Sequence, residues 1–297
     1  MIAITPFDSQ DWQTPFSPAA QGQALYEIES GHVLFFPKLG FELGEEEKHF
    51  LSPDTVGKSK NVSFDFASGA LRGESARVKR CEHETAALRA MMARYATCSR
   101  DLLNALLPHY SPSLLQARSS FRPVEVAGRR TSWRKNDTRL HVDSFPSSPV
   151  QDKRILRVFS NVNPAGQARA WRLGESFEAV ATRYLPTLHP PLPGSGALLQ
   201  LLHVTKSRRT AYDHYMLRLH DSMKADIDYQ SHAPQIYADF PPASTWIVFT
   251  DQVSHAAMAG QHLFEQTFYL PVAAMRDPAR SPLRTLERLT RRALVAA

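Results

Sequence analysis

The second half of the chain is a series of short apolar runs that are separated by turn-forming residues. Their β-branched and aromatic content predicts strands at 121–126, 140–145, 155–162, 235–240, 245–250 and 262–272. Helical spacing intervenes only at 175–185 and 212–228, so the regular strand–helix alternation of a doubly wound parallel sheet is absent. The pattern therefore favours a sandwich or jelly-roll.

The first part of the chain has mainly helical spacing. A short helix is expected at 18–30 and a strand at 32–36, and a pattern without internal Gly or Pro predicts a core-facing helix pair at 76–109. No repeat or low-complexity tract divides the 297 residues. We therefore expect one α+β domain at 1–297, with a mainly helical flank at 1–117, a β-core with a helical insertion at 118–275 and a basic amphipathic tail at 276–297.

Positive charge is concentrated in two regions. The chain has a net charge of +6, whereas residues 118–157 carry eight arginines and two lysines against four acids, and residues 276–297 carry six arginines against two. This distribution favours anionic partners. A non-catalytic, Arg-rich binding module is one interpretation. Because the basic regions lack a recognition helix and interleaved aromatic residues, we expect no nucleic-acid partner.

Targeting signals are absent from the sequence pattern. No apolar run approaches the roughly 18 residues of a membrane-spanning helix, and the first residues lack the basic and apolar parts of a signal peptide. The two cysteines, Cys81 and Cys98, do not make a disulfide framework. The expected location is cytoplasmic.

Several common active-site motifs fail on inspection. The stretch that ends in Val56-Gly-Lys-Ser59 has Ser52 where a phosphate-binding loop needs its first glycine. Gly194-Ser-Gly196 lacks the third glycine of a dinucleotide site, and no Gly-x-Ser-x-Gly, His-Glu-x-x-His or Cys-x-x-Cys is present. The sequence therefore has no phosphate-binding loop, dinucleotide fingerprint, serine nucleophile elbow, zincin motif or zinc ribbon.

One pair of residues has the spacing of metal ligands. His141 and Asp143 lie two positions apart in a predicted strand, so both side chains point to the same face. Together with a distant histidine, such a pair forms the facial triad of non-haem Fe(II) oxygenases. The spacing alone is weak evidence, because roughly one His-x-acid pair is expected by chance in a chain with this composition.

The order of the motifs around this pair resembles the double-stranded β-helix dioxygenases that use iron and 2-oxoglutarate. Residues 141–143 precede a strand at 154–164, and residues 249–255 and 260–271 follow much later. The resemblance implies that His141, Asp143 and His255 hold Fe(II). His262 is the competing third ligand, and it lies inside the following predicted strand.

A more specific resemblance covers nearly the whole chain. Residues 31–37, 133–146, 154–164 and 265–271 are similar to the bacterial hydroxylases of 3-deoxy-D-manno-octulosonic acid (Kdo). The resemblance implies that the protein hydroxylates carbon 3 of Kdo in Kdo-lipid A to give Ko. The reaction would use Fe(II), 2-oxoglutarate and O2, and ascorbate is a candidate reductant. The alternatives are an oxygenase for another anionic substrate and a catalytically inactive scaffold that binds neither iron nor 2-oxoglutarate.

The sequence departs from the commonest family pattern at the residue for the distal carboxylate of 2-oxoglutarate. The next arginine after His255 is Arg276, far beyond the expected position. We expect Arg157 to take this role, because an arginine in an apolar strand needs an anion, with Asn161 and Gln266 as hydrogen-bonding partners. The alternatives are that Arg157 pairs with an acid such as Glu265, and that Arg154 binds the carboxylate.

Two further basic segments have open interpretations. Arg134, Lys135 and Arg139 are expected to bind the carboxylate or phosphates of the substrate, or else to form a solvated loop. From residue 281 an apolar stripe with basic neighbours predicts an amphipathic helix. That helix either packs on the β-core or makes peripheral contact with the cytoplasmic face of the inner membrane.

Overall fold

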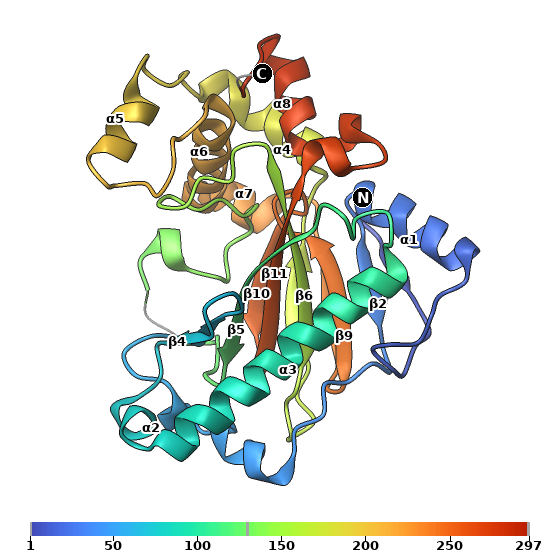
Figure 1. Ribbon diagram of the computed structural model, residues 1–297. Helices are drawn as coiled ribbons and strands as arrows, with labels where there is room; N and C mark the ends of the chain where they lie inside the picture. Colours follow the sequence, from blue (N-terminus) through green and yellow to red (C-terminus); the bar gives the residue numbers. More distant parts are fainter. Residues whose placement is uncertain (1, 129–130, 296–297) are drawn as a thin grey trace.

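Two β-sheets form the centre of the computed structural model, which describes residues 2–128 and 131–295 (Figure 1). The larger sheet contains, in spatial order, β1 (Ile4–Pro6), β2 (Val33–Phe36), β9 (Ser244–Phe249), β6 (Lys153–Asn161), β11 (Leu263–Pro271), β5 (Leu115–Arg122), β3 (Val62–Asp65) and β4 (Ala70–Arg72). The smaller sheet contains β10 (His255–Ala259), β7 (Arg169–Leu173) and β8 (Ile236–Phe240). The chain contains helices as well as these two sheets, which confirms a mixed α+β fold.

The two sheets face each other through aromatic side chains. Trp171 of β7 packs against Phe159 of β6 and Trp246 of β9, and Phe240 of β8 stacks on Trp246, with ring centroids between 4.1 and 5.6 Å apart. Strands β6 and β9 are buried on both faces. This explains why they read as continuous apolar runs rather than as alternating patterns.

Helix α3 (Glu82–Leu106) covers the other face of the larger sheet, where it crosses the strands in Figure 1. Its apolar stripe is at most 1% exposed and contains Leu88, Met91, Met92, Tyr95, Leu102, Leu103 and Leu106. Phe264 of β11 packs against Tyr95 at a ring distance of 4.8 Å. The core-facing helix predicted within 76–109 is confirmed as one long helix rather than a pair, because α2 (Ala76–Arg80) before it is a single turn that buries only Val78. The predicted first helix is confirmed as α1 (Pro18–Glu29).

A second group of helices lies at one end of the sheets, in the upper part of Figure 1. It comprises α4 (Phe177–Tyr184), α5 (Ser195–Leu201), α6 (Ala211–Ala225), α7 (Ile227–His232) and α8 (Pro282–Thr290). Side chains from α4, α6, α7 and α8 share one apolar cluster. The helices predicted at 175–185 and 212–228 are confirmed as α4 and α6, whereas α5 was not expected.

Some predicted strands differ from the structure. The strand predicted at 140–145 is wrong, because only His141 forms a bridge there, with His255, and the chain then turns at Pro146. Strands β7 and β10 were not predicted, since arginine and alanine give them low strand propensity. Three short strands within 1–117, β1, β3 and β4, were missed as well.

The C-terminal helix packs on the protein. Leu283 and Leu286 of α8 are 2% and 0% exposed in the apolar cluster with α4 and α6, so the packed alternative is confirmed for this stripe. The helix ends at Thr290, and the last two residues of the predicted tail, 296–297, lie outside the described residues. Within 2–128 and 131–295, no helix has both the length and the apolar character needed to cross a membrane.

Candidate metal centre and its cavity

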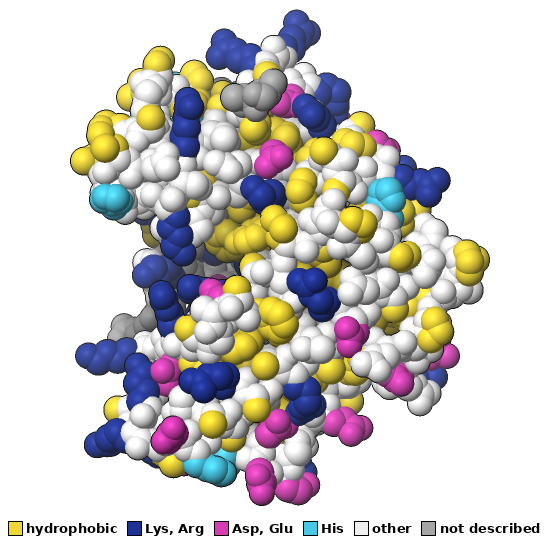
Figure 2. Space-filling view, in the orientation of Figure 1, with side chains coloured by type: hydrophobic (Ala, Val, Ile, Leu, Met, Phe, Trp, Pro, Cys, Tyr) yellow, Lys and Arg dark blue, Asp and Glu magenta, His cyan; other side chains and the backbone are white. Residues whose placement is uncertain are grey.

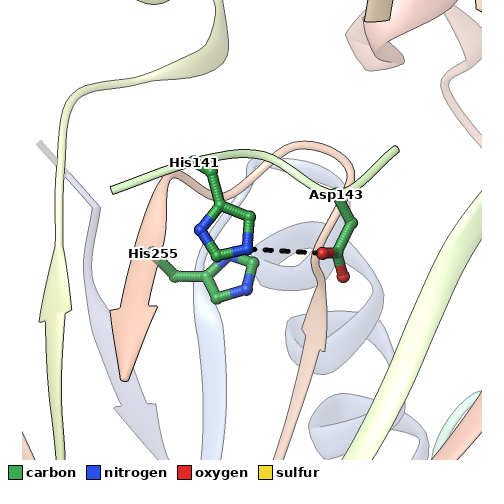
Figure 3. A group of neighbouring side chains, drawn as sticks. All are labelled: His141, Asp143 and His255. Atoms are coloured by element: carbon green, nitrogen blue, oxygen red, sulfur yellow. Dashed lines mark ion pairs between the residues drawn. The ribbon is translucent and has the colours of Figure 1, made fainter. Parts of the chain in front are cut away.

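Backbone hydrogen bonds fix the positions of the three predicted metal ligands. The amide of His141 donates to the carbonyl of His255 at 3.0 Å, and the amide of His255 donates to the carbonyl of His141 at 2.9 Å. The amide of Asp143 donates to the carbonyl of Thr250 at 2.8 Å. The extended segment therefore places His141 and Asp143 on one side, next to the start of β10 (Figure 3).

The donor atoms of these residues converge. One ligand atom from each of His141, Asp143 and His255 lies within 4.8 Å of the others. The Nδ1 atom of each imidazole is 2.8 Å from a backbone carbonyl, that of Arg139 for His141 and that of Val253 for His255. A carbonyl accepts only from a protonated nitrogen, so each Nε2 keeps its lone pair for a metal.

Burial sets the charges of this group. It lowers the pKa of His141 to about 3 and lowers that of His255, so both imidazoles are neutral at neutral pH. Burial alone would raise the pKa of Asp143, but the charge of Arg157 acts together with the neighbouring His141 and His255 and holds this pKa well below its usual range. Two neutral imidazoles and one carboxylate fit Fe(II), with positions left open for other ligands.

The competing ligand lies elsewhere. His262 precedes β11 in a left-handed conformation, with φ 61°, and is not part of the converging group. The structure therefore brings together the predicted set with His255 and excludes the set with His262.

A cavity of about 880 Å³ extends from the triad. Phe145, Phe159, Trp171, Leu217 and Leu263 contribute apolar walls. Its eight basic residues, which outnumber four acids, are Lys58, Lys60, Arg122, Arg134, Lys135, Arg157, Arg169 and Lys224. Figure 2 shows Lys and Arg side chains around a hollow on this side of the molecule, below the α5 region. A cavity with this charge suits anionic ligands.

Arg157 bridges the metal group to the neighbouring strand. Its guanidinium lies 3.1 Å from Oδ2 of Asp143 and 2.9 Å from Oε1 of Glu265. Glu265 also pairs with Arg122 at 2.7 Å. The alternative pairing of Arg157 with Glu265 is thus present, and the same guanidinium contacts Asp143.

Arg169 is a cavity residue that was not predicted from the sequence. It is 2% exposed, its Nη1 donates to the carbonyl of Gly260 at 2.7 Å, and its Nε has no hydrogen-bond partner. It forms no ion pair with any residue in the described part of the chain, and burial together with nearby Arg122 lowers its pKa to about 10. Strand alternation places Arg169 and Trp171 on the same face of β7. This would have indicated Arg169 from the sequence if β7 had been predicted.

Three residues proposed for the 2-oxoglutarate site lie outside the cavity. Gln266 points toward α3, where its amide bonds to Ser119 and to the carbonyl of Ala117, because alternate residues of β11 face opposite ways. Asn161, at the end of β6, donates to two backbone carbonyls. Arg154 is 0% exposed and pairs with Asp251 at 2.7 Å.

The three basic residues proposed for the substrate divide into two groups. Arg134 and Lys135 line the cavity, and Arg134 pairs with Asp221 of α6 at 3.1 Å while its side chain stays 61% exposed. Arg139 does not line it, since its guanidinium donates to the carbonyl of Lys224.

Helix α6 also contributes His220 to the cavity wall, and this contribution was not predicted. The ring of His220 lies 5.3 Å from that of His141.

The β-core and its buried His-Asp-His group define the class of Fe(II)- and 2-oxoglutarate-dependent dioxygenases. Residues 11–293 match the model of the 3-deoxy-D-manno-oct-2-ulosonic acid (Kdo) hydroxylase family, and the chain belongs to this family.

Solved structures of the Kdo hydroxylase KdoO are similar throughout. The cobalt(II) complex is 50% identical, with 99% of this chain and 98% of that chain covered and a TM-score of 0.96. The complex with alpha-ketoglutarate (2-oxoglutarate) and Fe(III) is 49% identical, with 99% and 97% covered and a TM-score of 0.94. The apo structure has 50% identity, the same coverage and a TM-score of 0.95. The comparison with curated proteins gave no match.

Proposed function

We propose that this chain hydroxylates carbon 3 of Kdo in Kdo-lipid A, giving Ko, as a modification of the lipopolysaccharide inner core. The observation that carries the proposal is a buried, neutral-imidazole triad at the wall of a cationic cavity, in a member of the Kdo hydroxylase family. Both 2-oxoglutarate and Kdo carry carboxylates, and lipid A carries phosphates. The charge of the cavity therefore suits every large ligand of the reaction.

The chain's own residues hold and orient the metal. His141, Asp143 and His255 supply three ligands, and the Nδ1 contacts to backbone carbonyls fix both rings. Fe(II) held there with 2-oxoglutarate would supply the activation of O2, by which one oxygen atom would be inserted into the substrate C–H bond and the other would enter succinate, with release of CO2. Arg157 keeps Asp143 ionised and oriented. Ascorbate would serve only to keep the iron reduced.

We assign the distal carboxylate of 2-oxoglutarate to Arg169, with Arg157 as the competing residue. The charge of Arg157 is already shared between Asp143 and Glu265, whereas Arg169 is buried in the cavity wall without an ion pair among the described residues. A buried guanidinium is costly unless an anion accompanies it. A carboxylate placed there would also accept from the unpartnered Nε1 of Trp171.

Arg134 and Lys135 are assigned to the anionic groups of the substrate. Both lie at the cavity and on one short turn, Trp133–Lys135. Arg139 is assigned a positioning role, because it ties the segment before His141 to the end of α6. Charge-assisted hydrogen bonds of this kind orient as well as bind an anionic sugar.

We also propose a more specific fold class and a cellular location for this protein. The facing sheets support a double-stranded β-helix, or jelly-roll, in a single domain at 1–297. We place the protein in the cytoplasm, with peripheral contact to the inner membrane, because the substrate is a membrane lipid.

Turnover of purified holoenzyme tests this function. With Fe(II), 2-oxoglutarate, O2 and Kdo-lipid A, we expect succinate release and one added oxygen atom in the Kdo residue, labelled when 18O2 is supplied. Omission of any one component should stop both. Succinate release that responds to another anionic sugar but not to Kdo-lipid A would contradict the substrate assignment.

A further inference from the structure

The helical insertion carries a concentration of exposed apolar side chains, which we call the α5 patch. Five of the ten large apolar side chains that are exposed in the described part of the chain lie between residues 192 and 204. They are Leu192, Leu198, Leu201, Leu202 and Val204, with exposed fractions of 77, 54, 75, 62 and 53%. Figure 2 shows hydrophobic side chains gathered at the upper left, where Figure 1 places α5. Such a concentration is typical of a contact surface.

The backbone around the patch is anchored, so the fold itself directs these side chains outward. Gly196 lies so close to the next segment that a Cβ there would come within 2.1 Å of the carbonyl oxygen of Arg209. The amides of Val204 and Thr205 both donate to the carbonyl of Leu199, at 2.9 and 3.2 Å. Leu198, Leu201 and Leu202 have the helical spacing that places them on one face.

The chain segment that carries the patch is basic, and the groove beside it contains one acidic residue, Asp152. No acidic residue occurs between Glu178 and Asp213, whereas Arg183, Lys206, Arg208 and Arg209 do. The end of the chain adds two exposed arginines, Arg291 and Arg292, just before Ala293–Val295, which line one groove together with residues 191–197. Apolar side chains with a basic rim complement the interface of an anionic bilayer, which offers acyl chains below and phosphate groups above.

We propose that the α5 patch docks the protein on an anionic lipid bilayer. The leucines of α5 enter the interface and the basic rim contacts lipid phosphates. The patch is tied to the active-site wall, because the amide of Lys206 donates to the carbonyl of Ser147 at 2.9 Å and Arg209 donates to the carbonyl of Pro146, itself a cavity residue. Docking would hold the cavity beside a membrane-borne sugar, and only this last step depends on the proposed function.

Vesicle sedimentation of the full chain tests the docking itself. We compare phosphatidylcholine vesicles with vesicles that also contain phosphatidylglycerol. The variant Leu201→Glu/Leu202→Glu should lose about tenfold or more in affinity for the anionic vesicles, because two inserted leucines become charged. Lys206→Gln/Arg208→Gln should lose mainly the salt-sensitive part of the binding.

The matched control is Ile227→Glu/Tyr237→Glu, which places two charges at apolar positions of 61 and 75% exposure outside the patch. It should bind vesicles as the unaltered chain does. Equal binding by the patch and control variants would overturn the proposal. So would a dimer, seen by sedimentation velocity, that the patch variant abolishes, because the patch would then contact a second copy.

Two substrates separate docking from catalysis. The patch variant should retain succinate release with a soluble Kdo glycoside and lose it with Kdo-lipid A in vesicles. If the unaltered chain binds anionic vesicles through the patch but acts on neither substrate, the docking proposal stands and the proposed function fails.

Discussion

The indole of Trp171 stacks on the imidazole of His255, with ring centroids 5.2 Å apart and an angle of 24° between the planes. Trp171 also packs against Phe159 and Trp246 of the facing sheet. One side chain therefore connects the aromatic layer between the sheets to a metal ligand. His255 thus rests on a packed core, whereas His141 and Asp143 come from the irregular extended segment beside it.

Replacement of Trp171 should affect both the core and the metal site. Trp171→Ala removes a side chain that is 2% exposed and should lower the free energy of unfolding by about 3–5 kcal/mol. It should also weaken Co(II) binding, because His255 loses the surface that orients its ring. Trp171→Phe keeps part of the stacking and should restore most of the metal affinity. Denaturant unfolding and Co(II) absorption measure the two effects, and unchanged metal affinity in the alanine variant would contradict the orienting role.

The triad should account for metal binding. His141→Ala and Asp143→Ala should each abolish hydroxylation and reduce Co(II) affinity by about 100-fold or more, since a three-ligand site loses one ligand. The control is His262→Asn, because asparagine tolerates the left-handed backbone at that position. This variant should bind Co(II) normally. Loss of binding in the control with retention in the alanine variants would reverse the ligand assignment.

Arg169 and Arg157 should respond differently to substitution. Arg169→Met should raise the Kd for 2-oxoglutarate by about 10- to 100-fold, the value of one charge-assisted hydrogen bond, and leave Co(II) affinity nearly unchanged. Arg157→Met should weaken Co(II) binding first, because Asp143 loses its cationic partner. Calorimetric titration of each ligand measures both constants. The opposite pattern would return the distal carboxylate to Arg157.

Residues that form a local pattern could be predicted from the sequence, whereas residues that only the tertiary fold brings together could not. The pair His141 and Asp143 is a local pattern, and the strand period alone predicts that both side chains share one face. Arg169 and His220 come from β7 and α6, and only the tertiary fold places them at the same cavity. Gln266 was misplaced because the register of β11 was not known. The short, alanine-rich sequence of β10 has low strand propensity, so it does not predict a strand. The strand forms because it pairs with β7.

Arg154 should matter for stability and not for 2-oxoglutarate. Its guanidinium and the carboxylate of Asp251 are 0% and 1% exposed, and removal of one partner leaves a buried charge unpaired. Arg154→Met should therefore lower the free energy of unfolding by about 3–5 kcal/mol. The double variant Arg154→Met/Asp251→Leu should recover much of that loss. Equal destabilisation by the single and double variants would show that the ion pair itself is not responsible.

Helix α8 should contribute stability through its buried leucines rather than through contact with lipid. Leu286 is 0% exposed among side chains of α4 and α6, so Leu286→Ala should lower the free energy of unfolding by about 2–5 kcal/mol. Arg288, whose side chain is 58% exposed on the same helix, provides the control. Arg288→Gln should change stability by less than about 0.5 kcal/mol, as is usual for a surface substitution. Binding to anionic vesicles should be unchanged in folded Leu286→Ala, because the α5 patch is intact. A loss of vesicle binding with unchanged stability would instead place α8 at the membrane.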